Sequence, residues 1–109
     1  MNLDIRGVDL VPTEALREHV SRRIAFALSR FSGHLKDVEV RLRDENGPKG
    51  GVDKVCRIKA TCHGLPTLVV EAVGTDLYGA IDGAADRAGR ALGRALRRQA
   101  SRRAPEPQL

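Results

Sequence analysis

Three stretches in which side chains alternate between apolar and polar follow one another in the middle of the chain. Alternation with a period of two is typical of a β-strand with one buried face. Only short, turn-forming sequences separate the stretches, and short connections join antiparallel neighbours, so the pattern predicts a three-stranded meander. The three strands and the two turns are DVEVRLRD (37–44), DKVCRIKATC (53–62), TLVVEAVG (67–74), ENGPKGG (45–51) and HGLP (63–66).

A fourth strand and two helices complete the predicted fold. The segment NLDIRG (2–7) alternates in the same way, and apolar residues then recur at helical spacing from Leu16 to Phe31, after the N-capping residue Thr13. Residues 76–98 form one long helix. Because the first connection contains a whole helix, the first two strands are expected to be parallel. The predicted class is α+β, a β-α-β-β-β-α domain with a four-stranded mixed sheet and both helices packed on one face.

The chain is short enough for one domain. Of its 109 residues, 1–100 are assigned to that domain and 101–109 to a disordered tail, because Pro105 and Pro107 disfavour a helix there. The first residues are charged and lack the apolar stretch of a signal peptide, and no run approaches the ~18 apolar residues that span a bilayer. A cytoplasmic protein, monomeric on its own, is expected.

Positive charge is concentrated on the two helices. The net charge is +5, and fifteen of the nineteen basic residues are Arg, the residue suited to forked phosphate contacts. Residues 87–103 hold seven Arg and no Asp or Glu. Without acidic partners one turn away these charges repel one another, which favours a polyanionic partner. The candidate binding residues are Arg22, Arg23 and Arg30 on the first helix and Arg87, Arg90, Arg94, Arg97 and Arg98 on the second.

Four glycines interrupt the second helix, although an interior glycine costs roughly 1 kcal/mol relative to alanine. On a helical wheel Gly79, Gly83, Gly89 and Gly93 all fall off the apolar face, beside the arginines. They are therefore expected to face solvent and to let a phosphate backbone approach closely, with the base composition of a GC-rich genome as the alternative. Phe26 also lies off its apolar face, where it either packs against a neighbouring element or stacks on a base.

No catalytic or metal-binding set emerges from the sequence. Cys62 and His63 are adjacent on a strand and point to opposite faces. Cys56 and Cys62 lie six residues apart on one strand, roughly 20 Å, too far for a disulfide or a shared ion. Both are predicted to be small core residues. No cofactor, metal, small-molecule substrate or membrane partner is expected, and the protein is not expected to be an enzyme.

The second helix opens with DLYGAID (76–82), which resembles the Asp-Met-Tyr-Ala-Ala-Ile-Asp opening of the short ribosome hibernation-promoting factors and ribosome-associated inhibitors. The stretches NLDIRG and TEALREHV (13–20) match that family too, and the resemblance covers roughly residues 1–98. It implies a protein that sits on the small ribosomal subunit, in the channel for mRNA and tRNA, and contacts its rRNA so that translation cannot start.

The family's rRNA-facing positions match Arg23, Arg87, Arg90 and Arg94, and its signature matches Asp76, Tyr78 and Asp82. From the residues themselves, Thr75 or Asp76 caps the second helix, Tyr78 is an anchor at the edge of the core and Asp82 is an exposed carboxylate. Two alternatives stay open. One is a binder of double-stranded nucleic acid away from the ribosome, and the other is a protein-interaction module that modulates a transcription factor.

Overall fold

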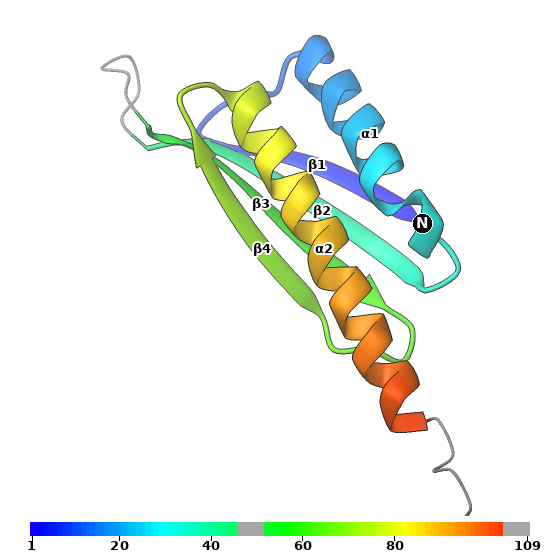
Figure 1. Ribbon diagram of the computed structural model, residues 1–109. Helices are drawn as coiled ribbons and strands as arrows, with labels where there is room; N and C mark the ends of the chain where they lie inside the picture. The colour runs from blue at the N-terminus through cyan, green and yellow to red at the C-terminus, as the bar shows by residue number, and fades with distance from the viewer. Residues whose placement is uncertain (46–51, 104–109) are drawn as a thin grey trace, which may run out of the picture.

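A sheet and a pair of helices form the two layers of the computed structural model, which describes residues 1–45 and 52–103 (Figure 1). The order of the elements confirms the predicted β-α-β-β-β-α fold. Residues 46–51 of the predicted turn and residues 104–109 of the expected tail lie outside the described residues. The elements are β1 (Asn2–Val8), α1 (Glu14–Leu28), the 3-10 helix η1 (Ser29–Phe31), β2 (Leu35–Asp44), β3 (Lys54–Cys62), β4 (Leu68–Gly74) and α2 (Leu77–Arg103).

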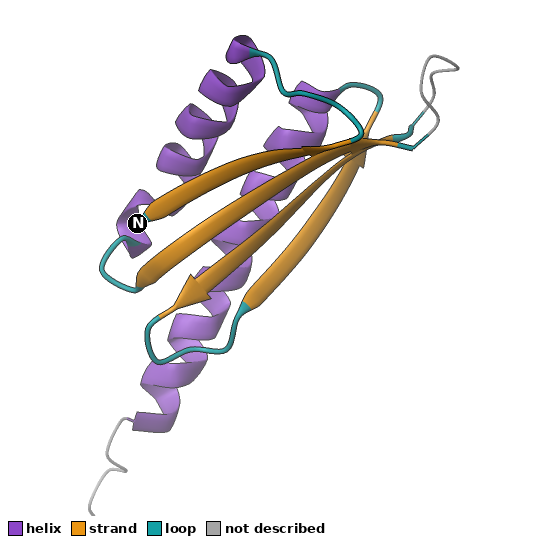
Figure 2. Cartoon of the chain, turned by 180° about the vertical axis from the view of Figure 1, so that it is seen from behind, coloured by secondary structure: helices purple, strands orange, loops and turns teal. Residues whose placement is uncertain are grey.

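The four strands lie in the order β1-β2-β3-β4. As predicted, β1 runs parallel to β2, with Leu3 beside Val38, and the other two pairs are antiparallel. Viewed from behind, the sheet carries both helices on its far face and none on the near one (Figure 2). Strands β1 and β4 are therefore the two edges of the sheet, and β4 lies beside α2.

The core lies between the two helices and the face of the sheet that they cover. Alternate residues of β2 and β3 are fully buried, among them Val40, Leu42 and Ile58. The edge strands contribute side chains that are only partly buried, such as Ile5 and Val70. The alternation in the sequence thus assigned the inward positions correctly.

Helix α1 begins and packs as its sequence predicts. The Thr13 hydroxyl oxygen accepts a hydrogen bond from the Leu16 backbone N–H at 3.1 Å, which satisfies one of the free donors of the first turn. The apolar residues at four-residue spacing from Leu16 to Leu28 are buried against the sheet and α2. The helix then tightens into η1, whose Phe31 is buried.

Helix α2 begins at one of the two predicted caps, Asp76, and ends later than expected. A carboxylate oxygen of Asp76 accepts a hydrogen bond from the Gly79 N–H at 2.6 Å, so Asp76 is the N-cap. The helix continues to Arg103, and its last three residues, 101–103, belong to the segment assigned to a disordered tail. These residues continue the helix, because a proline does not prevent the residues two or more positions before it from being helical.

Three of the four glycines of α2 do not face solvent as expected. Gly89 and Gly93 are buried against α1 and η1, and Gly83 is half-buried against β4; of the four, Gly79 is exposed. A Cβ on Gly89 would lie 3.1 Å from the carbonyl oxygen of Ala27. The helical wheel misplaced Gly89 and Gly93 because it took the sheet as the packing partner of α2 and could not include α1. Gly89 and Gly93 let α2 approach α1 and η1, and Gly83 lets it approach β4. The expectation that the glycines admit a phosphate backbone is therefore wrong for these three.

Candidate RNA-binding surface

A cluster of charged side chains joins the two helices near the start of α2. His19 Nε2 lies 2.7 Å from Asp82 Oδ1, and an Arg23 guanidinium nitrogen donates to Asp86 Oδ1 at 3.2 Å. Arg23 Nε also lies 3.1 Å from Asp82 Oδ1, as an ion pair without the alignment of a hydrogen bond. The ring of Tyr78 packs edge-on against His19, with 5.0 Å between the ring centroids.

These contacts give the signature residues physical roles. Asp76 caps α2, and Tyr78 anchors α2 to α1 through His19. Asp82 is hydrogen-bonded to His19 and forms an ion pair with Arg23. Arg23, one of the predicted RNA-facing residues, is thus already paired with two carboxylates within the protein. Its positive charge is offset by those acids, unlike that of the other candidates.

Arg87 is held at the edge of the sheet. Its Nη1 donates a hydrogen bond to the backbone carbonyl oxygen of Glu71 on β4 at 2.9 Å. Together with Arg90 and Arg94 it lines a shallow depression on the β4 side of α2. Three of the predicted residues are therefore brought together along one side of the helix.

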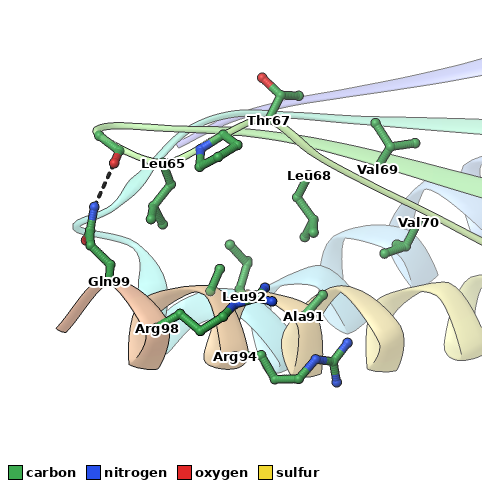
Figure 3. A pocket seen from close by; sticks show the side chains of 13 residues that line it. Leu65, Thr67, Leu68, Val69, Val70, Ala91, Leu92, Arg94, Arg98 and Gln99 are labelled. Carbon is green, nitrogen blue, oxygen red and sulfur yellow. Dashed lines mark hydrogen bonds between the residues drawn. The ribbon is translucent and has the colours of Figure 1, made fainter. Parts of the chain in front are cut away.

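Arg94 also borders a second, larger groove, between β4 and the C-terminal half of α2 (Figure 3). The groove measures about 490 Å³, and Arg98 lies further along the same helix. Gln99 Nε2 donates to the Gly64 carbonyl oxygen at 2.7 Å and ties the end of the groove to the turn before β4. The apolar lining includes Leu65, Leu68, Val70, Ala91 and Ala95.

Two further arginines converge on the opposite side of α2, over Gly93. The positions nearest a Cβ at Gly93 are Arg97 Nη1 at 3.3 Å and Arg30 Nη2 at 3.6 Å. The Arg30 guanidinium also stacks on the Phe31 ring, 4.5 Å from its centroid. Because Gly93 has no side chain, both guanidinium groups can lie over it, where α2 meets η1.

We use the name arginine surface for the predicted RNA-binding arginines that have no carboxylate partner among the described residues. In the described part of the chain, none of them lies within 4.0 Å of a carboxylate oxygen, and all are exposed. Arg87, whose guanidinium meets a backbone carbonyl rather than an acid, is counted with them. The arginine surface consists of Arg22, Arg30, Arg87, Arg90, Arg94, Arg97 and Arg98.

The opposite face of the molecule differs in this respect. On the bare face of the sheet Arg6 pairs with Asp4 at 2.7 Å and Arg41 with Glu39 at 2.6 Å. Arg43 pairs with two glutamates at 3.1 and 3.4 Å. Positive charge is mostly neutralised there and left unneutralised on the helices, so an anion meets the stronger field on the helical side.

Phe26 lies on the helical side as well. Its side chain is 79% exposed, so the expectation that it packs against a neighbouring element is wrong. The Arg23 guanidinium lies 5.6 Å from the centroid of its ring.

The thiols are built into the core, as predicted. Cys56 and Cys62 are both free and buried, and burial raises the pKa of the Cys56 thiol to about 12. Such a thiol stays protonated near neutral pH and is a poor nucleophile.

Within residues 1–45 and 52–103 no three His, Cys, Asp or Glu side chains group closely enough to hold a metal ion. No helix in these ranges is both long and apolar enough to cross a membrane.

The contacts between α1 and α2 were missed by treating each helix by itself. A signal for them exists in the sequence: His19 and Arg23 lie one turn apart, and so do Asp82 and Asp86. Two basic residues and two acidic residues with the same spacing are complementary when the helices lie side by side.

A family model described as sigma 54 modulation protein / S30EA ribosomal protein matches residues 3–100. The chain belongs to this family. Membership confirms the resemblance drawn from DLYGAID, NLDIRG and TEALREHV. No curated protein matches this S30EA-family chain in sequence.

Two solved structures share the S30EA-family fold seen here. The Thermus thermophilus Protein Y N-terminal domain is 29% identical, with a TM-score of 0.71, over 86% of this chain and 98% of that one. A ribosomal subunit interface protein from Coxiella burnetii has a TM-score of 0.73 at 15% identity, over 86% of this chain and 96% of that one, a likeness that concerns the fold alone.

Proposed function

We propose that this chain is a non-enzymatic, cytoplasmic ribosome hibernation factor. It binds rRNA of the small subunit in the channel for mRNA and tRNA and so keeps translation from starting. Family membership supports a ribosomal role, and a relative of the same fold is described as a ribosomal subunit interface protein.

The observation that carries the proposal is the arginine surface. Seven exposed arginines of α1, η1 and α2 belong to the helical layer and have no carboxylate partner in the described residues. Arginines of this kind contact phosphates, and such contacts supply most of the affinity for a structured RNA whose sequence is not read. No pocket for a small substrate is needed for this role.

Co-sedimentation with purified small subunits over a range of salt concentrations tests the proposal. Each neutralised phosphate contributes a slope of about −0.7 to −0.9 to the log–log dependence of affinity on salt. The double variant R90E/R94E is expected to lose most of its binding, because both residues are exposed on α2 and unpaired among the described residues.

The matched control is R41E/R43E, with the same change of charge on the bare face of the sheet, where the arginines are paired. It is expected to bind small subunits much more tightly than R90E/R94E does. Equal binding of wild type and R90E/R94E would contradict the proposal. Equal affinity for free RNA duplexes and for subunits would favour the off-ribosome alternative, and a salt-resistant protein partner without rRNA would favour the transcription-factor alternative.

A further inference from the structure

Phe26 is placed on α1 where a core residue would not be. The buried residues of α1 follow one another from Leu16 to Leu28 at four-residue spacing, and Phe26 lies off that stripe, on the exposed side of the helix. The other large apolar side chains more than half exposed in the described residues are Met1, Val11, Val52 and Val73, at the terminus, in loops or on the edge strand. Phe26 is thus the aromatic residue among them, and the one within a helix.

Arginines lie one turn before and one turn after Phe26 in the sequence. Arg22 lies four residues before Phe26, about 6 Å along the helix, and Arg30 lies four residues after it, in η1. Both are exposed and without a carboxylate partner among the described residues. A cationic stripe with one aromatic at its centre is the arrangement that single-stranded nucleic acids meet in their binding proteins, where arginines follow the backbone and rings stack on bases.

One guanidinium group does lie against the ring. Arg23 lies 5.6 Å from its centroid, within the range of a cation–π contact, and is itself fixed by Asp82 and Asp86 of α2. An exposed, supported ring offers a preorganised surface for a flat partner. Since Arg23 is paired within the protein, its place in binding is to support Phe26, and Arg22 and Arg30 are left to meet phosphates.

We propose that Phe26 stacks on an unpaired base of the bound RNA, with Arg22 and Arg30 on the phosphates that flank it. The inference rests on the proposed function and adds to it that the helical side recognises an unstacked nucleotide as well as a backbone. Bases in an intact duplex are stacked on one another and offer no face to Phe26, so the contact requires a loop, a bulge or a single strand.

The sequence contains no Trp, so F26W introduces one indole at the site and serves as its own reporter. Stacking of a base on the indole is expected to quench its fluorescence when single-stranded oligouridine is added, and a duplex RNA of the same length is expected to quench it much less. Equal quenching by the single strand and the duplex, or none by the single strand, would overturn the proposal.

Binding to small subunits provides the second readout. F26A and F26L are both expected to weaken binding by about 5- to 150-fold, the usual loss when one stacking residue is truncated, and F26W is expected to retain it. Because the side chain is 79% exposed, these variants are expected to fold as the wild type does, which circular dichroism checks.

The outcomes separate this inference from the proposed function. Wild-type binding by F26A, together with loss of binding in R90E/R94E, would refute stacking and leave the arginine surface as the binding site. Full binding by F26L with weak binding by F26A would point to an apolar contact with a ribosomal protein and would also refute stacking. Full binding by both F26A and R90E/R94E would refute both proposals.

Discussion

Two glycines of α2, four residues apart, should respond in opposite directions to the same substitution. In an isolated helix Gly→Ala is stabilising by roughly 1 kcal/mol, whichever glycine is changed. In this protein the new Cβ at Gly89 would lie 3.1 Å from the carbonyl oxygen of Ala27, a backbone atom of α1. The new Cβ at Gly93 would instead meet the ends of two arginine side chains, at 3.3 and 3.6 Å.

The difference between these neighbours sets the expected magnitudes. Arginine side chains can rotate away, so G93A is expected to keep most of the helical gain, about 0.5–1 kcal/mol. The Ala27 carbonyl cannot move unless α1 shifts, and overpacking of this kind costs about 1–3 kcal/mol. After the helical gain is subtracted, G89A is expected to be destabilised by up to about 2 kcal/mol.

Urea unfolding followed by circular dichroism measures both variants on one scale. For a domain of this size 1 kcal/mol corresponds to roughly 4–8 °C in Tm, so thermal unfolding should show G93A above the wild type and G89A below it. If G89A gained as much stability as G93A, the close approach of α1 and α2 at Ala27 would be refuted.

Three further predictions concern the caps, the cluster between the helices and the core. D76A is expected to lower the free energy of unfolding by about 1 kcal/mol, because it removes the N-cap of α2, and D76N should recover most of that in urea unfolding. D82N is expected to lower it by about 0.5–1 kcal/mol, because the half-exposed Asp82 pairs with His19 and Arg23; a double-mutant cycle with H19A should show coupling, and additive losses would contradict the contact. Since burial raises the pKa of Cys56 from 9.0 to about 12, the unfolded chain loses this proton at lower pH than the folded chain. Stability should therefore fall by up to about 1.4 kcal/mol per pH unit between pH 9 and 12. This part of the slope should be absent in C56A, and equal slopes in the two proteins would contradict it.

The strands could be predicted from the sequence because their partners are specified by a local pattern. Alternation alone placed Val40 and Ile58 in the core, and the length of the first connection alone made β1 and β2 parallel. Each of these inferences needs information from one strand or from one connection, which the sequence carries directly.

The relation between the helices could not be predicted in the same way. A helical wheel shows which residues of α2 share a side, but not that a second helix covers the side holding Gly89 and Gly93. For the same reason Asp82 looked like a free carboxylate, although it lies against His19 and Arg23. The sequence showed which arginines lie on the helices. That Arg23 pairs with Asp82 and Asp86 depends on how the two helices pack.

The hydrogen bond from Arg87 to the Glu71 carbonyl has a consequence for self-association. Strand β4 is an edge of the sheet, and an edge strand with free backbone groups is a template for pairing with the same strand of another molecule. By covering one of these carbonyls with a charged side chain, Arg87 makes the edge a poor template and adds repulsion between copies. A proposed RNA contact is thus also expected to disfavour edge-to-edge association of the unbound protein.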